Sequence, residues 1–453
     1  MARTDRPQKI KKSLIASFWD GFYASIQFGI LDNFATPFLL YLGGNNLAVG
    51  ILNFIRNALV SIIQGKTADI SVLLHSRKKL VVVCVFLAAA LILPTFLLPL
   101  LFGSSKTYVF IVLFALTSSI NMFATPAWMS IMSQYIPSHK RGHYFGWRSM
   151  VLGVVYTLSI LIAGLVLYYF GPISLLWAFM LLALIASIAR FLSFYFLTRM
   201  YEPRMIGHTT DYFSLWAFIR KFPRSNFARY CVFAAFFLSG IFLAAPFIPV
   251  YFLQEMKFNY FEFTLLTGAA AFMTMITQEY WGRFSDRYGN IKILKLTCAL
   301  MATVPIMLVF AHSFYVLILV QILAGFIWAG FNITSTNFIY DVAVPAKRER
   351  CVSYYNFLTG MGIGVGALLG GILFKYLPPI GTQYYTLFIV SAALRLFGAI
   401  LINYFVKEVR SVEPVRVKTL LFELSGIRYI GLISKKYLGK KKEKTDYEFI
   451  GGV

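Results

Sequence analysis

The stretch Trp281-Gly282-Arg283-Phe284-Ser285-Asp286-Arg287-Tyr288-Gly289-Asn290 lies between two long apolar runs and decides how the rest of the chain is interpreted. Two arginines, Arg283 and Arg287, flank the single aspartate, Asp286, and can keep that carboxylate ionised. Gly282 and Gly289 have no side chain to obstruct a tight backbone turn. We therefore predict a short loop here that presents charges between two apolar segments.

A weaker copy of this pattern occurs earlier in the chain, as Gly65-Lys66-Thr67-Ala68-Asp69. Both copies have a glycine, a basic residue, two further residues and an aspartate, in that order. The earlier copy lacks the arginine and glycine that follow Asp286 in the later one. A pattern that occurs twice indicates that the chain contains two related units.

The composition predicts an integral membrane protein. Hydrophobic residues make up 59% of the chain and charged residues only 13%, which is too little charge for a soluble domain of 453 residues. The mean hydropathy is +0.71. A helix needs about 20 apolar residues to cross a bilayer. We predict twelve spans, over residues 14–42, 46–66, 79–102, 107–134, 144–170, 173–198, 228–254, 262–281, 291–312, 314–338, 350–376 and 381–406.

The net charge of +24 does not indicate nucleic-acid binding, because the basic residues gather in alternate loops between the apolar runs. Loops rich in lysine and arginine stay on the cytoplasmic side. We therefore predict a multi-pass protein of the cytoplasmic membrane with both termini in the cytoplasm. The first apolar run is too long for a signal peptide and is interrupted by Asp20, so we expect it to remain as the first helix.

Three pairs of sites occur in the same order in the two parts of the chain. Pro37-Phe38, late in the first predicted span, matches Pro246-Phe247, late in the seventh. The two glycine–aspartate patterns match each other, and Lys140-Arg141 after a proline matches Arg348 after a proline. One six-helix unit therefore occurs twice, with both copies in the same orientation.

On these motifs the chain resembles the major facilitator superfamily, in which such loops join helices 2 and 3 and helices 8 and 9. The resemblance implies an all-α integral membrane fold of twelve transmembrane helices, built as two six-helix bundles that a parallel pseudo-twofold axis relates. The predicted parts are an N-terminal bundle over 1–198, a cytoplasmic linker with an amphipathic helix over 199–227, a C-terminal bundle over 228–406 and a basic cytoplasmic tail over 407–453.

The resemblance also implies a gate at the cytoplasmic side. Asp286 would hold the start of helix 5, and Asp69 the start of helix 11, because a carboxylate at a helix N-terminus is favoured by about 0.3–1 kcal/mol. These contacts exist only while the cytoplasmic ends of the two halves are together, so they favour the outward-facing state. The predicted gating residues are Gly65, Asp69, Arg141, Gly282, Arg283, Asp286, Arg287, Gly289 and Arg348.

Polar side chains within the predicted spans are candidates for a substrate cavity, because lipid cannot satisfy their hydrogen bonds. Asn53, Arg56, Asn57 and Gln64 form one stripe along the second span. Asp20 and Gln27 share a face of the first span, whereas Asp32 points elsewhere. The predicted cavity residues are Asp20, Gln27, Asp32, Asn53, Arg56, Asn57, Asn121 and Asn332.

Arg56 is the strongest single signal, since a charge in the middle of a span costs at least about 2.5–3.5 kcal/mol. Three interpretations remain open for it. It forms an ion pair with Asp20 or Asp32, it binds an anionic group of the substrate, or it extends to the membrane surface. The two aspartates are also candidate carriers of a coupling proton or sodium ion.

The function predicted from these features is secondary active transport of a small solute by alternating access, with a proton as the candidate coupling ion. Nothing resembles an enzyme motif, so we predict no enzymatic activity, no cofactor and no metal. The expected partners are the solute and membrane lipid, with anionic lipid at the basic tail, and the expected state is a monomer. The alternative is a non-transporting scaffold or sensor.

A run of six glycines over 360–371 serves either close packing or bending.

Overall fold

The structure, a computed structural model of the chain, describes residues 5–64, 70, 73–136, 138–203, 218, 220, 222, 224–342 and 348–409. The side chains of residues 5–7, 138–143 and 348–350 are not described. Gly65, Asp69, most of the predicted linker helix and the tail beyond residue 409 therefore lie outside the described residues, as do the side chains of Arg141 and Arg348.

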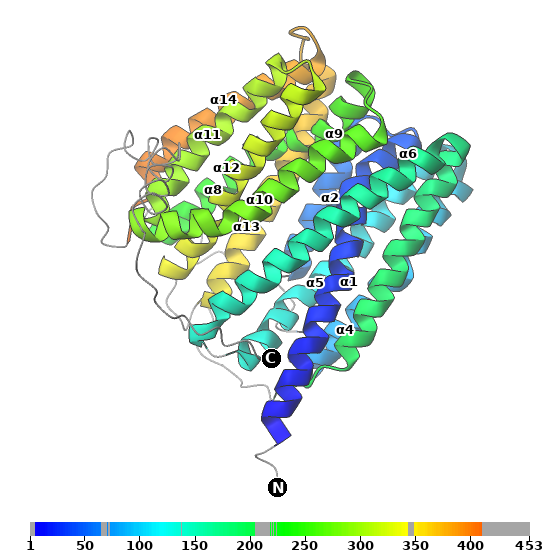
Figure 1. Cartoon of the computed structure of the whole chain (residues 1–453). Coiled ribbons are helices and arrows are strands. Elements are labelled where there is room, and N and C mark those ends of the chain that lie inside the picture. The colour runs from blue at the N-terminus through cyan, green and yellow to red at the C-terminus, as the bar shows by residue number, and fades with distance from the viewer. Residues whose placement is uncertain are drawn as a thin grey trace, which may run out of the picture.

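The described chain is helical and forms two bundles (Figure 1). The first bundle contains α1 (Asp5–Tyr41), α2 (Asn46–Gln64), α4 (Arg77–Leu97), the 3-10 segment η1 (Leu98–Ser105), α5 (Lys106–Tyr135) and α6 (Ser138–Thr198). The second contains α8 (Asn226–Phe242), η2 (Ala245–Phe247), α9 (Ile248–Val250), the π-helical η3 (Tyr251–Glu255), α10 (Tyr260–Tyr288), α11 (Asn290–Phe310), α12 (Phe314–Val342), α13 (Arg348–Tyr376) and α14 (Gln383–Phe405).

By length and composition, nine stretches of the described residues can cross a membrane. Two of them, Arg77–Tyr135 and Tyr144–Thr198, have 59 and 55 residues, more than twice what one crossing needs. The second is divided at Ser174, which has extended backbone angles and breaks α6 into two arms. The all-helical class is confirmed, and the count of twelve spans stays a prediction.

The loop predicted at residues 281–290 is wrong in its extent. Helix α10 continues through this stretch to Tyr288, and α11 begins at Asn290. Trp281, Phe284 and Tyr288 recur at helical spacing and are buried, and the indole Nε1 of Trp281 donates to the carbonyl oxygen of Phe326 at 2.7 Å. This apolar face outweighs the helix-breaking tendency of Gly282. The turn predicted at Gly289 is confirmed, because this residue has a φ of +94°.

The seventh predicted span is broken, whereas α1 continues through Pro37. Helix α8 ends at Phe242, before Pro246. The break is held by Arg395 of α14, which is 5% exposed. Its Nη2 donates to the carbonyl oxygen of Ile241 at the end of α8, at 3.2 Å. Its Nη1 donates at 3.1 Å to the carbonyl oxygen of Met301, which has no helical partner because residue 305 is a proline without an N–H.

The glycine run of α13 serves close packing on two faces. A Cβ atom added at Gly362, Gly366 or Gly370 would lie 2.1–2.3 Å from a carbonyl oxygen of the α8 segment. On the other face, a Cβ at Gly360 would lie 1.9 Å from Ser61 Oγ of α2, and one at Gly371 would lie 3.2 Å from the carbonyl oxygen of Asn46. Helix α13 therefore fits between α8 of its own bundle and α2 of the other bundle only because its contact positions are glycines, which have no side chain.

The two bundles meet along α2 with α13 and along α6 with α10. We call the end where α1 begins the basic end, because Lys78, Arg283 and Lys407 lie there, and the other end the opposite end. At the opposite end the bundles close over each other, with the rings of Phe34 and Phe263 6.0 Å apart. Toward the basic end the ribbons diverge in Figure 1.

The role of Arg395 predicts a loss of stability when it is replaced. Arg395→Gln leaves the buried carbonyl of Met301 without a donor, which costs about 1–3 kcal/mol, so the midpoint of thermal unfolding in mild detergent should fall. The control is Arg283→Gln, because that arginine is 74% exposed and its removal should change the free energy of unfolding by no more than about 0.5 kcal/mol. Equal midpoints for the two variants would show that the carbonyl groups find other donors.

Candidate functional site

An ion pair between α1 and α2 forms the centre of the candidate site. The guanidinium Nη2 of Arg56 donates to Oδ1 of Asp32, and the two side chains are 23% and 31% exposed. The same guanidinium lies over the ring of Phe114, 5.5 Å from its centroid. Of the two carboxylates predicted as partners of Arg56, the structure selects Asp32. The pair is not sealed from solvent, so its members can change partners.

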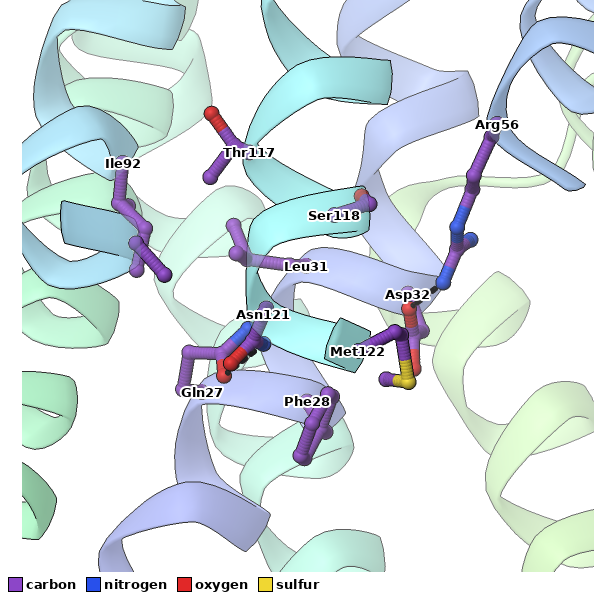
Figure 2. Close-up of a pocket in the computed structure, with 11 residues that line it drawn as sticks. Gln27, Phe28, Leu31, Asp32, Arg56, Ile92, Thr117, Ser118, Asn121 and Met122 are labelled. Atoms are coloured by element: carbon purple, nitrogen blue, oxygen red, sulfur yellow. Dashed lines mark hydrogen bonds and ion pairs between the residues drawn. The ribbon is translucent and has the colours of Figure 1, made fainter. Parts of the chain in front are cut away.

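The pair lines a cavity within the first bundle, which Figure 2 shows from close by. Its empty space is about 300 Å³, counted with the part that opens to solvent. Apolar and polar side chains alternate on its walls. The lining residues come from α1, α2, α4 and α5, and are Gln27, Phe28, Leu31, Asp32, Arg56, Ala88, Ile92, Thr117, Ser118, Asn121 and Met122.

Three of the predicted cavity residues belong to a buried polar network in the same bundle. Ser193 Oγ donates to the carboxylate of Asp20 at 2.6 Å and accepts from Nη1 of Arg190 at 3.1 Å. Arg190 Nη2 donates to the side-chain oxygen of Asn121, whose own Nδ2 donates to Gln27 at 3.1 Å. All five residues are buried. The network joins α1 and α5 to the second arm of α6.

Arg190 and Ser193 were not among the predicted site residues. Their signal was present in the sequence, because an arginine inside an apolar span needs a protein partner, and Ser193 lies one helical turn away. Each bundle has such a buried arginine on its last helix, Arg190 in the first and Arg395 in the second. The charge of Arg190 is compensated by the nearby carboxylate of Asp20. Arg395 instead donates to backbone carbonyls and to Ser391.

The remaining predicted cavity residues are half-buried. Asn53 and Asn57 of α2 donate to carbonyl oxygens one turn back in their own helix, at 3.0 and 2.8 Å. Gln64 donates to the carbonyl oxygen of Met122 of α5 at 3.2 Å. Asn332 lies on α12, in the other bundle, on the same helical face as the exposed Thr336. The structure therefore brings Asp32 and Arg56 together but places Asn332 in a different half.

The described gating residues lie at the basic end of α10. Arg283 pairs with Glu279 one turn earlier, with both side chains 74% exposed. Arg287 lies over the ring of Tyr288, 5.0 Å from its centroid, and Asp286 is exposed. These side chains are accessible in the present arrangement of the two bundles.

Two glutamates at the basic end were also missed by the sequence analysis. Glu202 follows the last helix of the first bundle and accepts from the backbone N–H of Lys78 at 3.1 Å and from Ser76 Oγ at 2.5 Å. Glu408 follows the last helix of the second bundle and accepts from the backbone N–H of Ile291 at 2.8 Å. Each carboxylate therefore caps the third helix of its own bundle, which extends the internal repeat.

Two apolar helical bundles, the first of which holds a polar, partly open cavity, are typical of a membrane transporter. The family model described as Major Facilitator Superfamily matches residues 15–311 and 230–436. The chain belongs to this superfamily, as its glycine–aspartate motifs predicted. Membership places the chain among membrane transporters and not among enzymes.

Curated relatives match part of the chain. The multidrug resistance protein MdtG of Proteus mirabilis (strain HI4320) is 31% identical over 214 residues, which are 44% of this chain and 50% of that protein. The class H tetracycline resistance protein of Pasteurella multocida is 26% identical over 136 residues, 30% of this chain and 34% of that protein. The chain spans half or less of the length of the curated relatives it matches.

Solved structures share the fold at low identity. The nucleoside transporter NupG is 12% identical, covers 88% of this chain and 98% of its own, and has a TM-score of 0.66. A bacterial homologue of the human lysosomal transporter Spinster is 13% identical, covers 87% and 95%, and has a TM-score of 0.63. At these identities the likeness concerns the fold alone.

The two aspartates of α1 are expected to differ in what they stabilise. Asp20→Asn removes the carboxylate near the buried Arg190, and an uncompensated buried charge costs about 3–5 kcal/mol. Asp32→Asn breaks a partly exposed pair, which contributes about 0–1 kcal/mol. Thermal unfolding in detergent should therefore show a large loss for the first variant and almost none for the second. Similar losses would show that the network and the ion pair are equally structural.

Proposed function

We propose that the protein moves a small amphipathic organic solute across the cytoplasmic membrane by alternating access, coupled to protons. The observation that carries the proposal is the Arg56–Asp32 pair, which is partly exposed in a cavity between membrane-spanning helices. A charge in that position is costly and persists where it has a task. A non-transporting scaffold has no use for such a pair.

The pair offers a simple means of coupling. A proton on Asp32 removes the negative charge that holds Arg56, so the guanidinium becomes available to an acidic or polar group of the solute. Loss of the proton restores the ion pair and displaces that group. The ring of Phe114 lies beside the guanidinium, and Phe28 adds aromatic surface to the cavity wall. Binding of a solute and binding of a proton then involve the same two side chains.

The solute class rests on the cavity and on the names of the relatives. Walls that mix apolar and polar side chains around one ion pair suit an amphipathic molecule with a charged or strongly polar group. The matched relatives are named for multidrug and tetracycline resistance. We infer a drug-like organic solute, held by aromatic contact and by one charge.

The arrangement of the bundles supports alternating access. The bundles are closed at the opposite end, where Phe179 lies 6.1 Å from Tyr260, ring to ring. At the basic end, an added Cβ on Gly146 of α6 would meet no atom within 4 Å. With the basic end in the cytoplasm, as the positive-inside rule favours, this arrangement is inward-facing. Closing that end would bring Asp286 of α10 toward the start of α6.

The function is tested by reconstitution in liposomes. Purified protein is reconstituted, and accumulation of a panel of amphipathic dyes and antibiotics is measured with and without an imposed pH gradient. Transport that requires the gradient supports the proposal. Equal fluxes in protein-containing and protein-free liposomes across the panel would contradict it. Binding of anionic lipid by the tail and a monomeric state remain predictions for the same preparation.

Arg56→Gln is expected to abolish transport while leaving the protein folded, because Asp32 loses its partner and the solute its guanidinium. Arg56→Lys keeps the charge but loses the planar fork, so KM should rise about tenfold or more. Both are measured by uptake into the same liposomes, with Arg199→Gln as the matched control at an exposed site. Unchanged uptake in Arg56→Gln would remove this residue from the site.

Asp286→Asn is expected to shift the equilibrium toward the state that is open at the basic end. The change keeps the shape of the side chain but removes the charge that favours the closed gate. A loss of 1–2 kcal/mol changes the population ratio by roughly five- to thirtyfold. The measurement is the labelling rate of single cysteines, Thr336→Cys near the basic end and Thr36→Cys near the opposite end.

The four native cysteines are buried, so labelling reports the introduced thiol. Labelling of Thr336→Cys should become faster and labelling of Thr36→Cys slower in the Asp286→Asn protein. The control is Glu279→Gln, which removes an exposed carboxylate from the same helix. Identical rates in the Asp286→Asn protein and the control would mean that this aspartate does not act as a gate.

A further inference from the structure

Four buried polar groups that lack a full set of hydrogen-bond partners gather near the basic end of the first bundle. They are Ser17 Oγ on α1, Trp128 Nε1 on α5, and Tyr144 Oη and Arg148 Nε on α6. Among the residues that the structure describes, Trp128 Nε1 and Arg148 Nε have no partner, and the hydroxyls of Ser17 and Tyr144 have only each other. Unpaired donors between membrane-spanning helices are costly, since lipid offers no replacement partner. Several of them in one place indicate that something is bound there.

The four side chains converge on one guanidinium. Nη2 of Arg148 donates to the backbone carbonyl oxygen of Ser17 at 3.0 Å, and its Cζ lies 4.7 Å from the centroid of the Trp128 ring. Tyr144 lies one helical turn before Arg148, on the same face of α6. Gly21 provides the room, because a Cβ atom there would lie 2.2 Å from Arg148 Nη2. The guanidinium is thereby held in place while Nε remains unpaired.

The surroundings carry an excess of positive charge. Arg148 and Arg190 both lie within electrostatic range of one carboxylate, that of Asp20. Asp20 already accepts a hydrogen bond from Ser193, which in turn accepts one from Arg190. One acid therefore serves two guanidinium groups, and Arg190 is the one joined to it through a hydrogen-bond chain. Arg148 therefore shares that carboxylate with Arg190.

The chemistry of the unpaired groups defines the ligand. The indole N–H of Trp128 and the Nε–H of Arg148 can only donate. The hydroxyls of Ser17 and Tyr144, bonded to each other, still have one O–H to donate. Such a set requires acceptor oxygens and rejects a cation. Water supplies acceptors but no charge, whereas an oxyanion supplies both. We propose that Ser17, Trp128, Tyr144 and Arg148 form a binding site for a carboxylate or phosphate group.

This site is separate from the Arg56–Asp32 cavity. Ser17 precedes Asp32 by fifteen residues on the same helix, which places them about 22 Å apart along its axis. None of the four side chains lines that cavity. Near the basic end, the oxyanion has two sources of the same chemistry, a free anion in solution and the phosphate of an anionic lipid headgroup. The site adds a regulatory or stabilising ligand and does not depend on the proposed transport activity.

The test measures the thermal unfolding midpoint of the full-length protein in two arms. In the first, the protein in detergent is titrated with inorganic phosphate, with chloride at equal ionic strength as the reference. In the second, the protein is placed in phosphatidylcholine nanodiscs with and without phosphatidylglycerol, in the absence of phosphate. The variants are Trp128→Phe, which keeps the ring but removes the donor, and Arg148→Gln. The matched control is Trp177→Phe, at a tryptophan that is 72% exposed.

We expect a saturable rise of the midpoint in at least one arm, and a half-saturating concentration raised about tenfold or more by Trp128→Phe and by Arg148→Gln. A response in the first arm identifies a free anion, and one confined to the second identifies a headgroup. If Arg148→Gln fails to fold, Trp128→Phe decides the matter alone. The proposal is overturned if wild-type protein shows no saturable rise in either arm, or if Trp128→Phe responds as Trp177→Phe does.

Discussion

The structure depends on the hydrogen-bond chain that runs from Asp20 through Ser193, Arg190 and Asn121 to Gln27. Lipid offers these groups no partner, so a buried guanidinium can exist only where the protein supplies acceptors and a counter-charge. Supplying them requires one relative placement of three segments that are far apart in the chain. The chain of bonds thereby makes the first bundle a rigid body, which a rocking movement of two halves needs.

The second bundle solves the same problem with backbone groups instead of a carboxylate. Pro305 leaves the carbonyl of Met301 without its helical partner, and Arg395 donates to it. Arg395 also donates to the carbonyl of Ile241 at the end of α8, which accepts from the backbone N–H of Ala244 as well. The two bundles therefore share a buried arginine on their last helix and a capping glutamate after it. They differ in how the charge is compensated, and among the described residues only the second bundle has its first helix broken.

Rigid bundles leave two kinds of adjustable contact. The partly exposed ion pair of Arg56 and Asp32 can exchange partners, because solvent already reaches both side chains. The interface of α2 with α13 relies on glycines such as Gly360 and Gly371, so helices approach there without interlocking side chains. Such an interface permits sliding at low cost. The polar site and this glycine-lined interface share α2, so Arg56 lies on a helix that contacts the other half.

The sequence by itself determined the membrane class and the family, because hydropathy, charge asymmetry and the Asp286 motif are local patterns, and it predicted the repeated six-helix plan. It also named two aspartates as candidate ion-pair partners of Arg56, beside anion binding and extension to the surface, and it placed Asp20 and Gln27 on one face. Only the tertiary structure decided between Asp20 and Asp32, joined Arg190 to Asn121, and gathered Trp128 and Arg148. Those choices depend on the rotation and register of one helix against another, which apolar spans of similar composition leave undetermined. The length of α10 was likewise decided by the packing of Trp281 against Phe326 of α12. A local sequence pattern does not show such a contact between two helices.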